Sequence, residues 1–229
     1  MGHLFQKPLI IEFNGLPGAG KTTVANALQR RLEGMGVSTV THYYRNIFHR
    51  KPQTLLMAPR YWKLIKASLS FAGLLSKRSY IQRILLMIKF VRMYRHFESD
   101  KPADCLLVDQ GIIQGIVSIA HNEKLTRSDI LENLIGLMHM DAMPLIFVNC
   151  NVSNETANER ILSRPSNGCR VENMTCEERN RTLLIQSNNF YLIRETINEK
   201  YSSVSVVEVD NEEPVENAVD LIINHIIPM

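Results

Sequence analysis

Short apolar runs alternate with segments of helical periodicity along the chain. Five runs predict buried strands, over Leu9–Asn14, Val37–Tyr43, Asp104–Asp109, Leu145–Cys150 and Val204–Val209. Helical spacing predicts helices over Lys21–Glu33, Leu55–Phe97 (two or more), Ile112–His121, Ser128–His139, Ser153–Ser163, Cys176–Lys200 and Val215–Ile226. Strands separated by helices predict an α/β fold with a parallel sheet and helices on both faces. Ligands of such sheets bind at the carboxyl ends of the strands.

Length and composition indicate a single soluble domain spanning residues 1–229. The chain is 45% hydrophobic and 21% charged, which is typical of a globular protein. No apolar stretch approaches the roughly 20 residues of a spanning helix, and no secretory signal precedes the first strand. The four cysteines show neither a CxxC pair nor zinc spacing. We therefore expect a cytoplasmic protein with reduced, structural thiols.

A glycine-rich segment after the first strand carries the most specific signal. Residues 15–22 read Gly-Leu-Pro-Gly-Ala-Gly-Lys-Thr, which matches the phosphate-loop pattern GxxxxGK[ST] between a strand and a helix. Its backbone N–H groups and the helix N-terminus are expected to bind the phosphates of ATP. The residues assigned to this role are Gly15, Pro17, Gly18, Ala19, Gly20, Lys21, Thr22 and Thr23. Lys21 is expected to reach the β- and γ-phosphates, and Thr22 to bind Mg²⁺.

Asp109 follows four apolar residues at the end of the third predicted strand. A carboxylate at this edge can hold hydrated Mg²⁺ or accept a proton from an attacking hydroxyl. The alternative is an aspartate that only caps the following helix. We interpret Asp109 as a catalytic residue and, together with Thr22, as a metal ligand.

Three arginines form a second candidate catalytic group. Arg160 and Arg164 are four residues apart in a predicted helix and should share a face, and Arg170 follows a loop rich in breakers. A guanidinium suits the charge on a transferring phosphoryl group, and a mobile lid over about 164–174 could deliver it. The alternative is a solvated helix face followed by an ordinary loop.

Charge is distributed unevenly along the sequence. No Asp or Glu occurs between Glu33 and Glu98, although twelve Lys and Arg residues lie there. Such a segment creates a field that attracts anions. We interpret residues of about 44–101 as a basic, helical insertion that binds an anionic acceptor. A solvated amphipathic helix pair and a patch for anionic membrane surfaces are alternatives, whereas no recognised nucleic-acid-binding module is present.

At this point the chain resembles the P-loop nucleoside and nucleotide kinases, and most of all the thymidylate kinases. The resemblance rests on the Gly-Ala-Gly-Lys-Thr-Thr core of the phosphate loop and on Val108-Asp109-Gln110, where thymidylate kinases carry Asp-Arg. It also rests on the segment from Glu159 to Glu172, which is similar to their lid, and on Glu208-Val209-Asp210. Similar cores occur in adenylylsulfate kinases. The resemblance implies a three-layer P-loop fold with a five-stranded parallel sheet, ATP and Mg²⁺ as cofactors, a nucleoside monophosphate as acceptor, and a homodimer.

Two departures concern the acceptor. Gln110 replaces the arginine that holds the acceptor's phosphate in that family, and Cys169 replaces the lid aspartate. Arg92 or Arg45 of the basic segment could substitute for the missing arginine, so Arg45, Arg92 and Gln110 are the candidate substrate residues. A kinase of a non-nucleotide metabolite or membrane-linked acceptor, and an ATP-dependent regulatory module without catalysis, are the competing functions.

Overall fold

The computed structural model describes residues 8–43, 90, 93–94, 96–97, 99–100, 102–122, 145–165, 170–202 and 204–227. Within these ranges the strands are β1 (Leu9–Gly15), β2 (Thr39–Tyr43), β3 (Cys105–Asp109), β4 (Leu145–Asn151) and β5 (Val204–Asp210). The helices are α1 (Lys21–Gly34), α5 (Ile112–Asn122), α7 (Asn154–Leu162), the 3₁₀ helix η3 (Arg170–Asn173), α8 (Cys176–Lys200) and α9 (Val215–Ile226). The helices expected at Ser128–His139 and over most of Leu55–Phe97 lie outside the described residues.

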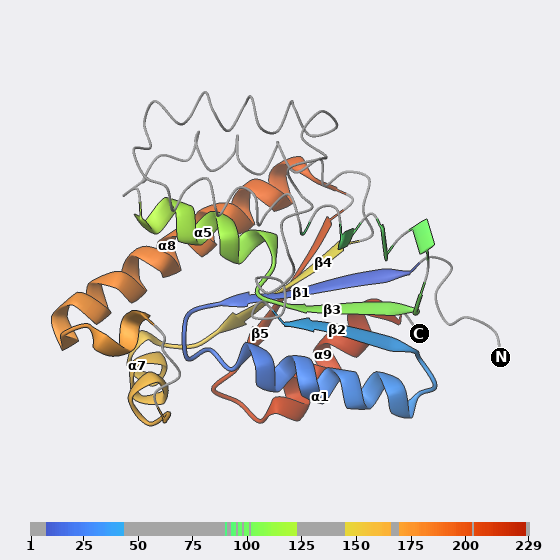
Figure 1. The fold of residues 1–229 in the computed structure, drawn as a ribbon, viewed down its shortest axis with the longest axis horizontal. Coiled ribbons are helices and arrows are strands. Elements are labelled where there is room, and N and C mark those ends of the chain that lie inside the picture. The colour runs from blue at the N-terminus through green and yellow to red at the C-terminus, as the bar shows by residue number, and fades with distance from the viewer. Residues whose placement is uncertain are drawn as a thin grey trace, which may run out of the picture.

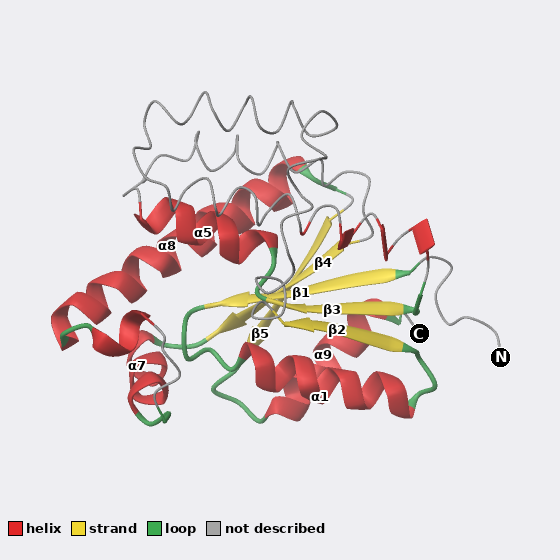
Figure 2. Cartoon of the chain, in the orientation of Figure 1, coloured by secondary structure: helices red, strands yellow, loops and turns green. Residues whose placement is uncertain are grey.

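The five strands form one sheet in the order β2-β3-β1-β4-β5, and each neighbouring pair is parallel. Helices α1 and α9 cover one face of the sheet, whereas α5 and α8 cover the other (Figure 1). Figure 2 shows the same three layers by type of structure. The predicted α/β architecture is therefore confirmed, with β1 at the centre and its carboxyl end leading into the glycine-rich loop.

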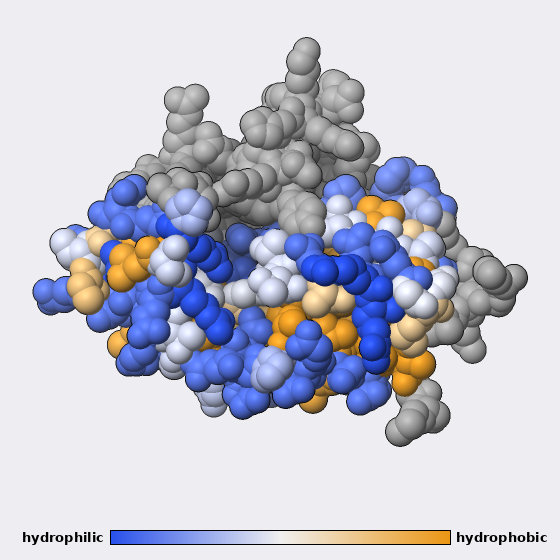
Figure 3. Space-filling view, turned by 90° about the horizontal axis from the view of Figure 1, so that it is seen from below, coloured by the Kyte–Doolittle hydropathy of each residue, from blue (hydrophilic) through white to orange (hydrophobic). Residues whose placement is uncertain are grey.

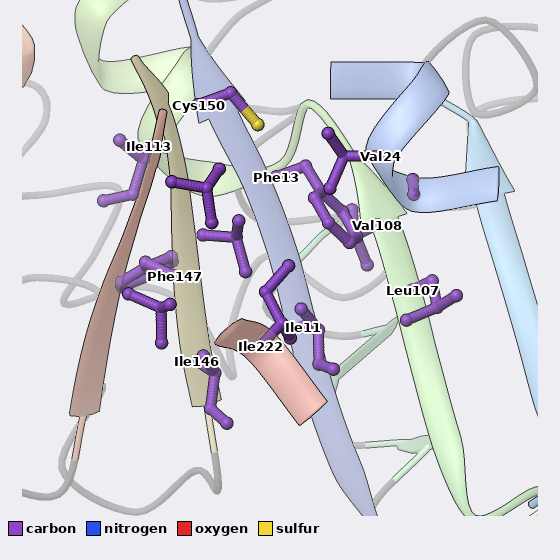
Figure 4. Close-up of a cluster of buried hydrophobic side chains, with 14 of the residues drawn as sticks. Ile11, Phe13, Val24, Leu107, Val108, Ile113, Ile146, Phe147, Cys150 and Ile222 are labelled. Carbon is purple, nitrogen blue, oxygen red and sulfur yellow. The ribbon is translucent and has the colours of Figure 1, made fainter. Parts of the chain in front are cut away.

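The hydrophobic core lies on both faces of β1, β3 and β4, whose side chains are almost entirely buried. Figure 4 shows a cluster in which side chains of these strands meet Val24 of α1 and Ile222 of α9. On the solvent side, the face formed by α1 and α9 is largely hydrophilic, with some hydrophobic residues among them (Figure 3). Among the described helices, none has the length and apolar character that a bilayer-spanning segment requires.

One boundary differs from the sequence expectation at the end of α1. The second strand begins at Thr39 rather than Val37, because Val37 belongs to the helix cap: its N–H donates to the Leu32 carbonyl at 3.0 Å. Gly36 has a positive φ of 81° and its N–H donates to the Glu33 carbonyl. These two bonds make a Schellman motif, in which Gly36 is the left-handed residue of the cap.

Candidate functional site

The glycine-rich loop joins the carboxyl end of β1 to α1, as the sequence predicted. Lys21 is the first residue of α1 and is 7% exposed, and its Nζ donates to the carbonyls of Gly15 at 3.0 Å and Leu16 at 2.8 Å. The ammonium therefore lies inside the curve of the loop. The first N–H groups of α1 have no partners within the helix and carry the positive end of its dipole. Cation and amides together suit a polyanion such as a phosphate chain.

Asn211, in the loop after β5, holds the far side of the phosphate loop. Its side-chain Nδ2 donates to the Ala19 carbonyl, and its backbone carbonyl accepts from Arg160 Nη2 at 2.9 Å. Gly20 has a φ of 75°, and a Cβ at that position would collide with the Asn211 amide. The positive φ favours glycine at position 20, and any side chain there would displace the Asn211 amide. The sequence did not single out Asn211, because its partner lies far away along the chain.

Thr22 and Asp109 meet at the carboxyl edge of the sheet, as expected for a metal-binding pair. Thr22 Oγ1 donates to Asp109 Oδ2 at 2.7 Å, and Asp109 is 6% exposed. The other carboxylate oxygen, Oδ1, is buried and has no hydrogen-bond partner. A buried carboxylate oxygen without a donor, beside a threonine hydroxyl, is an environment that fits Mg²⁺, which prefers oxygen ligands and is often held by few carboxylates plus phosphates. Thr23 lies exposed in the first turn of α1.

The backbone of Gln110 has a left-handed conformation that few residues other than glycine adopt. Its φ is 65°, which makes it the one residue other than glycine with a positive φ among the described residues. Its N–H donates to the Phe13 carbonyl at 3.3 Å, so the turn is tied to β1. Left-handed residues other than glycine concentrate at functional sites. The structure thus places Gln110 directly beside Asp109, at the edge where an acceptor is expected.

The predicted pairing of Arg160 and Arg164 on one helix face is wrong. Helix α7 ends at Leu162, and Arg164 lies in the exposed bend that follows. The physical reason is Pro165, since a residue before proline disfavours the helical conformation. Arg160 remains on α7, and its guanidinium donates to Asn211, which in turn contacts the phosphate loop. Arg170 begins η3, and its side chain lies outside the described residues.

Arg179 is a site-forming residue that the sequence analysis missed. This arginine of α8 is 5% exposed and donates to the carbonyls of Val171 at 3.0 Å and Met174 at 2.8 Å, and to Asn158 Oδ1 at 2.9 Å. It therefore fastens the second half of the expected lid to α7 and α8. The available sequence signal was the Thr175-x-x-Glu178 capping box that starts α8.

A small polar cavity of about 140 Å³ lies beside Gly15 and Leu16, between the carboxyl end of β4 and α8. Arg194 on its wall donates to Glu208 through Nη1 and lies 4.7 Å from the centre of the Tyr191 ring. Glu208 also accepts from Asn151 Nδ2 at 3.0 Å. The Glu208-Val209-Asp210 segment thus has a structural role at this edge.

Several predicted residues cannot be placed in this site. Arg45, Arg92 and Cys169 lie outside the described residues.

Cys105 and Cys150 are free and buried, and burial raises the pKa of the Cys150 thiol to about 12. A thiol that stays protonated in the core fits the expected structural role.

Comparisons with known proteins find a likeness in the phosphate-loop segment and in the fold. The adenylylsulphate kinase family model matches residues 7–57, which include the phosphate loop but only a minor part of the chain. No curated protein matches the sequence. A structure of deoxyadenosine kinase from M. mycoides with the products dCMP and a flexible dCDP aligns with a TM-score of 0.56 and 18% identity over 96% of this chain and 100% of that chain. A second structure of that enzyme, with bound dATP, aligns with a TM-score of 0.54 and 19% identity over 94% of this chain and 98% of that chain.

The likeness to these structures shows the fold, which is that of the P-loop nucleoside and nucleotide kinases. The family-model match adds a likeness to adenylylsulphate kinases over the phosphate loop. The particular resemblance to thymidylate kinases stays a prediction, as do the cytoplasmic location and the homodimer.

Proposed function

We propose that this chain is an ATP-dependent phosphotransferase that transfers the γ-phosphate of ATP to a small anionic acceptor, a nucleoside monophosphate. The observation that carries the proposal is the buried Lys21 ammonium within the phosphate loop, beside the Thr22–Asp109 pair with its unpartnered Oδ1. The neighbouring deoxyadenosine kinase structures, which contain a nucleoside monophosphate and diphosphates or triphosphates, support the same chemistry for this fold.

In this proposal each residue of the site has a separate task. The loop amides and Lys21 bind the β- and γ-phosphates, and Thr22 with Asp109 would hold Mg²⁺, which neutralises phosphate charge. A nucleoside monophosphate attacks through an ionised phosphate oxygen and needs no base, whereas with a nucleoside acceptor Asp109 would accept the proton of the attacking hydroxyl. Arg164 and Arg170 of the lid stabilise charge on the transferring group, whereas Arg160 supports the loop from outside through Asn211.

A nucleoside is a second candidate acceptor, and the residue beside Asp109 favours it. Gln110 is uncharged and cannot neutralise a phosphate as arginine would. The neighbouring structures also belong to an enzyme named as a nucleoside kinase. The two candidates differ only in the acceptor, so one assay separates them.

The test is acceptor-dependent release of ADP from ATP and Mg²⁺, with nucleosides, their monophosphates and sugar phosphates as a panel. We expect turnover with one or more nucleoside monophosphates and a fall of about 10²–10³-fold or more in Lys21→Ala, because charge stabilisation of the transition state is lost. Arg30→Ala, an exposed cation on α1, is the matched control and should retain the wild-type rate.

Turnover with nucleosides alone would select the second candidate. Turnover only with sugar phosphates would show that the acceptor is a non-nucleotide metabolite. A folded protein that binds ATP but releases no ADP with any acceptor would contradict the proposal and favour a regulatory module.

A further inference from the structure

A fully buried carboxyl group lies beneath the proposed site and has no task in the mechanism above. Glu12 is in the middle of β1 and is 0% exposed, among apolar neighbours such as Ile11 and Phe13. Side chains alternate along a strand, so Glu12 faces the opposite side of the sheet from Phe13, toward α5. An apolar residue would be cheaper to bury at this position than a carboxyl group.

The bonds of Glu12 reach two other elements. Oε1 accepts from the backbone N–H of Ile113 at 2.8 Å, and Oε2 accepts from the hydroxyl of Tyr94 at 2.7 Å. Ile113 is the second residue of α5, so the carboxyl group satisfies an N–H that the helix itself leaves open. Tyr94, also 0% exposed, belongs to the described helical positions of 90–100, at the end of the basic sequence.

The turn before α5 is packed closely on this carboxyl group. A Cβ at Gly111 would lie 2.5 Å from the Glu12 carboxyl carbon and would also collide with the Tyr94 hydroxyl. No side chain therefore fits at position 111 without displacing both groups. The chain passes from Asp109 through Gln110, which has a left-handed backbone conformation, and then through Gly111 into α5. This turn lies directly over Glu12.

We propose that Glu12 is a positioning residue for phosphoryl transfer: by holding the first turn of α5, it fixes the turn of residues 109–111 and so the Asp109 carboxylate opposite Thr22. Through Tyr94, the same carboxyl group connects this turn to the end of the expected acceptor-binding segment. The catalytic meaning of this positioning rests on the proposed function, whereas the effect on the turn does not.

A purely structural role would give a different result in the variant Glu12→Gln. The amide has nearly the same shape and can still accept one bond, but it cannot accept from both Ile113 and Tyr94 in the same way. Because burying a carboxyl group is costly, the amide is expected to retain the folded state. Loss of positioning would therefore show in the site rather than in global stability.

The experiment compares wild type, Glu12→Gln and Tyr94→Phe, with Glu33→Gln on the surface of α1 as the matched control. Hydrogen exchange of the amides of residues 110–113 is measured without nucleotide or metal, together with kcat and the dissociation constant for ATP. For Glu12→Gln we expect hydrogen exchange at residues 110–113 to be about tenfold faster and kcat to be about tenfold lower. Changes of this size correspond to the loss of one buried hydrogen bond. The ATP dissociation constant should stay within about threefold, because Lys21 and the loop amides are unchanged.

Tyr94→Phe should change both quantities in the same direction but less, since the Ile113 contact remains. Exchange at 110–113 and kcat that equal wild type in folded Glu12→Gln would overturn the inference. If the wild-type protein transfers phosphate to no acceptor, the proposed function fails, and the exchange rates alone then decide whether Glu12 fixes this turn.

Discussion

At the scale of single residues, the site depends on side chains whose partners are distant in sequence. Thr22 and Asp109 were each expected from local patterns, and their contact at 2.7 Å follows from the pairing of β1 with β3. Glu12 and Asn211 could not be predicted as site-forming residues, because neither belongs to a motif. Their roles come from Tyr94 and Ala19, which local patterns do not connect to them.

Glu12 also makes stability depend on pH. Burial raises its pKa from 4.5 to about 7, against the opposing effect of the Tyr94 and backbone hydrogen bonds. The folded state binds the proton of Glu12 more tightly than the unfolded state does. The protonated Glu12 carboxyl group therefore stabilises the folded state fully below about pH 4.5, and this stabilisation is lost as pH rises through about 7.

We therefore predict that the stability of wild type relative to Glu12→Gln falls by up to about 3 kcal/mol between pH 4.5 and pH 8, from the shift in pKa. Urea unfolding of both proteins across this range measures the difference. Parallel pH curves for the two proteins would show that the carboxyl group does not titrate in this way.

At the scale of elements, the hydrophobic pattern predicted the five strands and the helices α1, α5, α7, α8 and α9 to within two residues, but not the 3₁₀ helix η3. The errors have local causes: the Schellman motif delays β2, and Pro165 ends α7 before Arg164. The lid illustrates what a pattern cannot give. Its second half is fixed by Arg179, which lies beyond the predicted lid and binds carbonyls of Val171 and Met174.

Separate effects are expected for the arginines around the lid. Arg164→Ala and Arg170→Ala should reduce kcat by about 10³-fold, within the range for arginines that stabilise phosphoryl transfer, while ATP still binds. Arg160→Ala should instead weaken ATP binding, because its guanidinium supports the Asn211 carbonyl beside the phosphate loop.

Steady-state kinetics and ATP titrations of the three variants, with Arg30→Ala as control, measure this separation. Near-normal turnover of both Arg164→Ala and Arg170→Ala with the true acceptor would show that the lid assignment is wrong.

At the scale of the whole molecule, the alternation of strands and helices predicted a parallel sheet but not the strand order. That order, with β1 between β3 and β4, brings the phosphate loop and Asp109 to one edge. The charge pattern adds a basic sequence between Glu33 and Glu98 to an otherwise acidic chain. Its expected role at the acceptor site stays a prediction, because a charge pattern gives the sign of a ligand but not its identity.

Isothermal titration calorimetry with ATP, in the presence and absence of Mg²⁺, tests the central claim most directly. The site described here predicts binding of about one ATP per chain that depends on Mg²⁺ and is strongly weakened in Lys21→Ala. Folded wild-type protein that takes up neither ATP nor GTP in the presence of Mg²⁺ would contradict it.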